Sequence, residues 1–261
     1  MGGIKAILRK ELAVYFTTPI FYILGFFFLF LGGALFSLYV VVNYHYAYQL
    51  YGAEIMRNPQ AAAMLNPMDL VFRPLFGWLG VIFLMMLPFI TMRLFAEEKR
   101  SGTGELLFTY PLSDWAVILG KFLAALLIYL IFLGLTLIYA VELSVLLRLE
   151  WGGLASGYLG LVLLGGAYLS LGLFVSSLTE NQIIAGVVAI ALLLLFWIVG
   201  MEEIVGTMGV GKFFGALSVR GHFENFSRGV IDTRDLVYYG SFIYFFLFLT
   251  KRQLESRSWR A

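Results

Sequence analysis

The segment GTMGVGKF, residues 206–213, has a spacing that could bind phosphate. Gly206, Gly211 and Lys212 occupy the glycine and lysine positions of a phosphate-binding loop. The next position must hold a magnesium ion through Ser or Thr, and here it is Phe213. The segment also follows an apolar run instead of a predicted strand. We therefore interpret its glycines as loop residues and predict no nucleotide site there.

Histidine and cysteine chemistry is sparse in this chain, which has two histidines and no cysteine. No His and Glu pair has the helical spacing of a zinc site. His45 lies among tyrosines that are typical of a membrane edge. His222 with Glu224 could form a site on an outer loop, although a solvated loop is the simpler interpretation. Glu202 and Glu203 are interpreted as an interfacial acidic pair, not as an acid and base couple. No catalytic residue, metal site or cofactor site is predicted.

A charged cluster lies between two strongly apolar segments, in LFAEEKRSGTGELLFTYPLSDWAVILGK. Ser101 or Thr103 could cap a short helical run that ends before Pro111, and Ser113 with Asp114 is expected to cap the next helix. The alternative is a solvated connection stiffened by surface charges. The cluster comprises Glu97, Glu98, Lys99, Arg100, Ser101, Gly102, Thr103, Gly104, Glu105, Leu106 and Leu107. In a membrane protein, such a segment would offer a surface to a soluble partner.

The composition places the rest of the chain in a membrane. Apolar residues make up 61% of the 261 residues and charged residues only 13%, and the mean hydropathy is +0.89. A single soluble core cannot bury so much apolar surface. The net charge of +2 is too small to indicate a nucleic-acid partner.

Six apolar runs predict six transmembrane helices in an all-α fold. The first would be roughly 36 Å long at about 1.5 Å per residue, enough to cross a hydrocarbon core of about 30 Å. The sixth is short and would need flanking residues, or Lys251 and Arg252 reaching for the interface. The predicted spans are residues 19–42, 74–95, 116–141, 154–178, 183–201 and 236–250.

Charged groups are rare inside these spans. Arg93, Lys121 and Glu142 lie near predicted span ends, where we expect each charged head to reach water. A carrier driven by protons or sodium usually places ionisable groups within the hydrocarbon region. The pattern therefore favours a transporter that is driven by an energy source other than a proton or sodium gradient. It also disfavours a membrane-embedded enzyme.

The distribution of Lys and Arg predicts the orientation of the chain. Eleven of the 18 fall before the first span, around the connection between the second and third spans, or after the sixth. The other seven fall in the opposite connections. Because cytoplasmic loops carry the excess of positive charge, both termini are predicted to be cytoplasmic.

Residues 1–18 predict an amphipathic helix on the membrane surface that ends where Pro19 turns the chain inward. Its polar positions are Lys5, Arg9, Lys10 and Glu11. Its apolar positions, at near-helical spacing, are Ile4, Ile7, Leu8, Leu12, Tyr15 and Phe16. A secretory signal also begins with basic residues before an apolar run, but this run is too long and has no cleavage pattern, so we expect a retained helix.

Small residues at four-residue spacing mark the fourth span, as in Gly153 and Gly157, and in Gly172 and Ser176. Such spacing lets helix backbones approach closely. We interpret it as helix packing in preference to a path for substrate.

The charged cluster and its surroundings resemble the signature of bacterial type 2 ABC (ABC-2) exporter permeases. The resemblance rests on EEK, GT, ELL, PLSDW and GK within AEEKRSGTGELLFTYPLSDWAVILGKFLAAL. It extends through KELAVYFTTPIFYI, GLFVSSLTENQIIA and HFENFSRGVIDTRDLVYY, so that the matching segments are spread from residue 10 to residue 239, over most of the chain. Within that family the chain is most similar to gliding-motility-associated permease subunits of the GldF type. Gly104 departs from the pattern, because relatives usually carry a large apolar residue there.

The resemblance implies a single permease domain over residues 1–261, in the bacterial cytoplasmic (inner) membrane, with no ATPase site of its own. A separate ABC ATPase subunit would bind ATP and magnesium, and a second permease copy or a related permease subunit would complete the exporter. Residues 96–114 would be the cytoplasmic coupling loop, in which Glu97 to Leu107 contact the ATPase. Residues 1–18 would be the connecting helix, which moves with that loop against the membrane lipids.

The same resemblance leaves a second function open. The chain could be a scaffold or mechanical subunit that does not export, in an ATPase-driven envelope or gliding-motility complex with a periplasmic partner. The residues do not identify a cargo.

Overall fold

The structure is a computed structural model that describes residues 2–57, 65–102, 113–147, 149–199 and 217–258. The regular elements of the described residues are all helices, with no strand among them. In chain order the elements are α1 (Gly2–Thr17), α2 (Pro19–Leu38), the π-helical η1 (Tyr39–His45), α3 (Tyr46–Arg57), the π-helical η3 (Met68–Phe72), α4 (Arg73–Thr91), α5 (Arg93–Arg100), α7 (Asp114–Leu135), α8 (Leu137–Leu146), α9 (Trp151–Leu178), α10 (Gln182–Ile198), α13 (Val219–Ser227) and α14 (Thr233–Ser258).

Local sequence signals explain several helix boundaries. Thr18 has an extended backbone and Pro19 occupies the first turn of α2, where a proline costs no helical hydrogen bond. The side chain of Ser113 accepts a hydrogen bond from the Ala116 amide at the start of α7, which confirms the predicted cap. Asn181 caps α10 in the same way, through the Ile183 amide.

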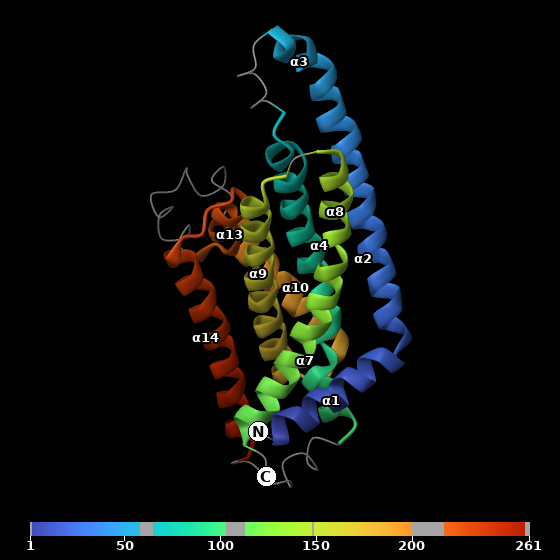
Figure 1. The fold of residues 1–261 in the computed structure, drawn as a ribbon. Coiled ribbons are helices and arrows are strands. Elements are labelled where there is room, and N and C mark those ends of the chain that lie inside the picture. Colours follow the sequence, from blue (N-terminus) through green and yellow to red (C-terminus); the bar gives the residue numbers. More distant parts are fainter. Residues whose placement is uncertain (1, 58–64, 103–112, 148, 200–216, 259–261) are drawn as a thin grey trace.

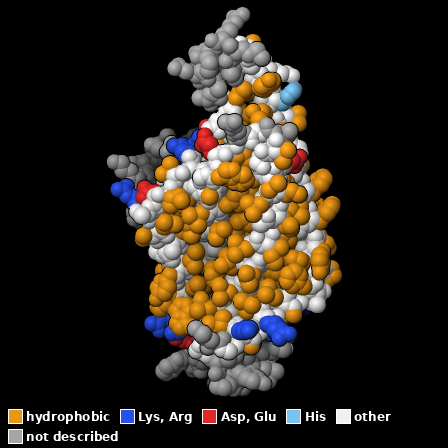
Figure 2. Space-filling model, viewed as in Figure 1, with side chains coloured by type: hydrophobic (Ala, Val, Ile, Leu, Met, Phe, Trp, Pro, Cys, Tyr) orange, Lys and Arg blue, Asp and Glu red, His pale blue; other side chains and the backbone are white. Residues whose placement is uncertain are grey.

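Four helices of the described chain are long and apolar enough to cross a membrane: Pro19–Ala53, Met68–Arg100, Asp114–Val145 and Trp151–Leu178. They contain the whole of the first four predicted spans. The fifth predicted span falls on the apolar α10, which has 17 residues. The sixth falls on α14, which has 26 residues and is not among the four. Figure 2 shows a broad apolar surface with charged side chains towards its two ends, as expected of a multi-pass membrane protein.

The long helices are interrupted more often than the hydropathy pattern predicts. The second predicted span is divided between α4 and α5, which meet at Met92, one turn after Pro88. The third is divided between α7 and α8 at Thr136. Hydropathy averages over such breaks, because a bend changes the direction of the chain without changing its composition.

Helix α9 forms the centre of the bundle and packs against α4, α5, α7, α10, α13 and α14 (Figure 1). Its small residues make this close packing possible. A Cβ atom at Gly157 would lie 2.1 Å from the Phe76 ring, and one at Gly172 would lie 2.2 Å from Thr91 Oγ1. The helix-packing interpretation of these small residues is confirmed.

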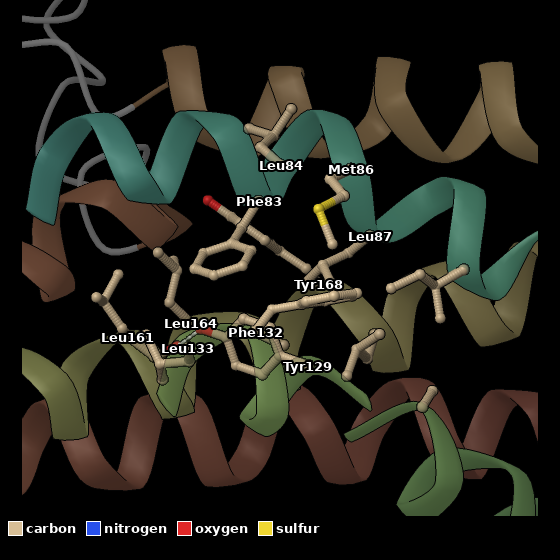
Figure 3. Packing of buried hydrophobic residues seen from close by; sticks show 14 of the residues in the cluster. Phe83, Leu84, Met86, Leu87, Tyr129, Phe132, Leu133, Leu161, Leu164 and Tyr168 are labelled. Atoms are coloured by element: carbon tan, nitrogen blue, oxygen red, sulfur yellow. Dashed lines mark hydrogen bonds between the residues drawn. The ribbon is translucent and has the colours of Figure 1, made fainter. Parts of the chain in front are cut away.

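Aromatic and aliphatic side chains fill the space between α4, α7 and α9 (Figure 3), and Phe28 of α2 packs against them. The Phe83 ring stacks on Phe28 at 4.5 Å between centroids and meets Tyr129 edge-on at 4.6 Å. The Tyr129 hydroxyl donates a hydrogen bond to the Leu161 carbonyl of α9. These contacts hold the spans together as one packed core.

Helix α1 crosses one end of the bundle, beside the first turns of α7 (Figure 1). It packs closely on α7, because a Cβ atom at Gly120 would lie 2.8 Å from Ile7 Cγ2. The end of α5 lies at the same end of the molecule. The fold therefore brings the N-terminal helix together with the described part of the charged cluster.

Candidate functional site

Four charged side chains from three helices meet at this end of the bundle, and we call them the charged junction: Lys10 and Glu11 of α1, Glu98 of α5 and Lys121 of α7. Lys121 Nζ lies 2.7 Å from Glu11 Oε1 and 2.8 Å from Glu98 Oε1. Lys10 Nζ lies 2.7 Å from the same Glu98 oxygen. Glu98 therefore bridges two lysines, and Lys121 bridges two carboxylates.

Much of the charged junction is buried. The exposed fraction of the side chain is 1% for Lys121, 8% for Glu11 and 13% for Glu98, whereas Lys10 is 49% exposed. The prediction that Lys121 reaches water is wrong, because α1 and α5 cover it. The assignment of Glu11 to the polar positions of α1 is also corrected, since its carboxylate points inward to Lys121.

Charge balance makes this burial tolerable. The charged junction has two ammonium groups and two carboxylates, and an unpaired charge would be very costly at this depth. Burial by itself would lower the pKa of Lys10, but the hydrogen bond and charge of Glu98, helped by Glu11, raise that pKa above its usual value. The protonated, paired form of Lys10 is therefore the stable one.

A second contact ties α1 to the joint between α4 and α5. The buried Tyr15 hydroxyl donates a hydrogen bond of 2.9 Å to the Ile90 carbonyl. The Arg93 guanidinium lies 4.3 Å from the centre of the Tyr15 ring and donates to Thr18 Oγ1 at 3.2 Å. Burial raises the pKa of Tyr15, so this phenol stays a neutral hydrogen-bond donor.

A third contact ties α5 to the end of α9. The Phe95 and Ala96 amides donate to Ser176 Oγ at 3.1 and 3.2 Å, and that hydroxyl donates to the Met92 carbonyl. These bonds satisfy amides in the first turn of α5. The Lys99 ammonium donates to the Ser177 carbonyl. Helix α5 is thus held by α1, α7 and α9 together.

The predicted coupling residues divide into a buried and an exposed group. Glu98 and Lys99 face the bundle, whereas Glu97 and Arg100 are exposed. Ser101 ends α5, and Gly102 follows with a φ of +69° that favours glycine. The remaining predicted members, Thr103, Gly104, Glu105, Leu106 and Leu107, lie outside the described residues, and their assignment stays a prediction. On α1, Lys5 and Arg9 are exposed, and their interfacial role stays a prediction.

Lys121 is the residue of the junction that the sequence reasoning missed. A signal was present, because Lys121 lies seven positions after Asp114 at the start of α7, or about 10 Å along the helix at about 1.5 Å per residue. A lysine that deep in an apolar helix needs a partner. Its partners are Glu11, 110 positions earlier in the chain, and Glu98, 23 positions earlier. A hydropathy pattern gives no information about such distant pairs.

The opposite end of the bundle has its own polar contacts. His222 of α13 lies 2.6 Å from Asp235 Oδ1 and stacks on Tyr238, and Asn225 donates to the other oxygen of Asp235. His222 and Glu224 lie on the helix α13, where a solvated loop was the simpler interpretation. Glu224 is bound by two arginines, Arg73 and Arg228.

Over the described residues, no group of three His, Cys, Asp or Glu side chains could hold a metal ion. Residues 206–213 and the Glu202 and Glu203 pair lie outside them.

The comparisons with known proteins agree with the membrane fold. Residues 49–213, more than half of the chain, match the family described as ABC-2 family transporter protein. The matched region includes Glu98 and Lys121 but not α1. No curated protein matches the sequence. The described helices and this match together show that the chain belongs to the ABC-2 family of transporter proteins, as a multi-pass membrane component.

Proposed function

We propose that this chain is the permease subunit of an ATP-driven exporter, in which a separate ABC ATPase subunit hydrolyses ATP. ABC-2 family membership implies an ATPase partner in general. Export by alternating access, six spans with both termini in the cytoplasm, and the narrower likeness to gliding-motility permeases are parts of this proposal. The chain would have no nucleotide site of its own.

The charged junction is the observation that carries the proposal. In the described chain, α5 contains the first residues of the predicted coupling loop, and its Glu98 lies within 2.8 Å of Lys10 of α1 and Lys121 of α7. A force applied to the loop by a closing ATPase dimer would therefore move an interfacial helix and a spanning helix together. Such closure would bias the spans between inward and outward states, as long as the ATPase binds the two states differently.

Substitution of the buried Glu98, compared with that of an exposed glutamate, tests whether the charged junction transmits motion from the ATPase to the spans. In the complete complex in lipid nanodiscs, Glu98→Gln should leave the ATPase subunit bound but reduce the substrate-stimulated ATPase rate towards its basal value. Glu150→Gln is the control, because Glu150 is an exposed carboxylate that lies outside both the charged junction and the predicted coupling residues. Equal stimulation in the two variants would show that the junction does not transmit the motion.

Docking is tested separately from transmission. Deletion of residues 102–105 should release the ATPase subunit from tagged protein in gently solubilised membranes, as judged by mass spectrometry of the co-purified chains. Recovery of the ATPase with the deleted protein would contradict the assignment of this loop. Absence of any ATPase from the intact sample would contradict the exporter proposal as a whole.

A further inference from the structure

A cavity of about 460 Å³ opens at the end of the bundle opposite the charged junction, between α4, α10 and α13. Its walls combine cationic and aromatic side chains. Those that matter here are Arg73, Trp78, Trp197, Arg220, Phe223 and Glu224. Guanidinium groups beside aromatic rings are suited to an acidic group that is attached to an apolar body.

The charges at this cavity do not cancel. Glu224 is the carboxylate in its wall, and it lies 3.4 Å from Arg73 Nη2 while also binding Arg228. Arg220 lies 5.9 Å from the centre of the Trp197 ring, and within the described part of the chain no carboxylate lies within 4 Å of it. The cavity therefore presents an exposed cation with capacity to bind an anion.

An apolar groove of about 510 Å³ runs along α2 and α4 and adjoins the cavity at two shared lining residues. Trp78 and Val81 line both the cavity and the groove. The Trp78 indole donates a hydrogen bond of 2.7 Å to the Tyr39 hydroxyl, which fixes its ring at the connection. Further along, the groove is lined by Leu24, Leu31, Leu35, Ile82, Met85 and Phe89.

The length of the groove matches one leaflet of a bilayer. From Trp78 to Phe89 the chain advances 11 residues along α4, or about 16 Å at about 1.5 Å per residue. Half of a hydrocarbon core of about 30 Å is about 15 Å. A polar, cationic site thus lies at one end of an apolar groove whose length equals the thickness of the acyl region of one leaflet.

We propose that the cavity and groove together bind one acidic lipid, with its phosphate on Arg220 and Arg73 and an acyl chain against α2 and α4. A soluble anion would use only the cavity, and a neutral lipid only the groove. The binding rests on the described side chains. With both termini in the cytoplasm, as proposed above, this end of the bundle faces outward and the lipid would belong to the outer leaflet, and only that placement rests on the proposed function.

Lipid selectivity of the purified full-length chain tests this proposal. We would titrate it in a neutral detergent with phosphatidylglycerol and with phosphatidylcholine of identical acyl chains, and count bound lipids by native mass spectrometry. Phosphatidylglycerol should bind more tightly. Arg220→Gln should weaken its binding about tenfold, the effect of losing one charge-assisted hydrogen bond. Arg234→Gln, which changes an exposed arginine at the same end but outside the cavity, should leave binding unchanged.

A second variant tests the groove. Leu31 is 45% exposed, so Leu31→Trp can fill the groove without disturbing the core, and it should also weaken binding of phosphatidylglycerol. Equal binding of the two lipids, or equal effects of Arg220→Gln and Arg234→Gln, would overturn the proposal. So would displacement of the lipid by glycerol phosphate together with no effect of Leu31→Trp. Failure of ATPase coupling would appear only in the Glu98→Gln experiment, so the two proposals fail separately.

Discussion

The two ends of this bundle use the same charged residue types in opposite ways. At one end, Lys121 and its two carboxylate partners are almost completely buried between α1, α5 and α7. At the other end, the Glu224 side chain is 51% exposed and its partner Arg228 is 53% exposed. The first arrangement fixes three helices relative to one another, and the second leaves charges accessible to water and to ligands.

The difference follows from solvation. An exposed ion pair exchanges good solvation by water for a modest attraction, so its net contribution is small. A buried pair is costly to form. Removing only one of its partners costs far more, because the remaining charge stays buried without water or a counter-charge. The charged junction therefore specifies how α1, α5 and α7 pack together. The exposed pairs of Glu224 can be exchanged for water or a ligand at little cost in stability.

The largest expected effect is at Lys121. Lys121→Met should destabilise the protein by about 3–5 kcal/mol, because Glu11 and Glu98 would lose their shared buried cation. The free energy of unfolding can be measured by SDS titration in mixed micelles.

Lys251→Met is the matched control for this prediction. Lys251 and Glu255 form a pair of similar length, 2.9 Å, with side chains 27% and 29% exposed. That control should cost about 1 kcal/mol or less. Equal losses in the two variants would mean that burial does not distinguish the junction.

A smaller effect is expected at Glu98. Glu98→Gln should destabilise the protein by about 2 kcal/mol, the scale of a hydrogen bond to a charged group. In this variant Lys121 still pairs with Glu11, and the half-exposed Lys10 can be solvated by water. The loss of stability is therefore smaller than for Lys121→Met. Glu97→Gln should fall within about 0.5 kcal/mol of the unchanged protein, as for an ordinary surface substitution. A larger loss for Glu97→Gln than for Glu98→Gln would reverse the assignment of their burial.

The sequence was sufficient for features that repeat along a helix. Apolar runs located the first four spans, small residues in α9 predicted close packing, and Ser113 predicted a cap that the structure contains. Each of these depends on neighbours within one helix. The charged cluster could be recognised in the same way, because its residues are contiguous.

The charged junction could not be assembled from the sequence, because its members are brought together by packing. Glu11 and Lys121 are 110 positions apart. The helical pattern of α1 placed Glu11 among polar residues, although it shares a face with the buried Ile7 and Tyr15. A periodic pattern identifies the buried face from apolar residues, so it misses a carboxylate whose buried position depends on a lysine of another helix.

At the opposite end, Arg228→Gln should have little effect on stability. The exposed pair with Glu224 contributes at most about 0.5 kcal/mol, as is typical of pairs at i and i+4 on a helix. Thermal unfolding followed by circular dichroism, with Arg234→Gln as the control, should show midpoints close to that of the unchanged protein. A loss comparable to that of Lys121→Met would show that the two ends are energetically alike.

The smallest effect concerns Lys10, the exposed edge of the charged junction, and it depends on pH. The pKa of Lys10 is raised in the folded protein above its ordinary value of 10.5. The stabilisation from this shift is therefore fully present below about pH 10.5 and is lost as the pH rises through the higher folded pKa. Because the Lys10 side chain is 49% exposed, water screens the pair and the contribution should be no more than about 0.2 kcal/mol.

The measurement is the difference in unfolding midpoint between the unchanged protein and Lys10→Met, followed from neutral to strongly alkaline pH. The two proteins share every other titrating group, including the tyrosines, so the difference isolates the ammonium of Lys10. We expect a constant advantage for the unchanged protein at neutral and mildly alkaline pH, and a decline only above about pH 10.5. A decline between about pH 5 and 7 would contradict this, because a lysine with a raised pKa keeps its proton throughout that range.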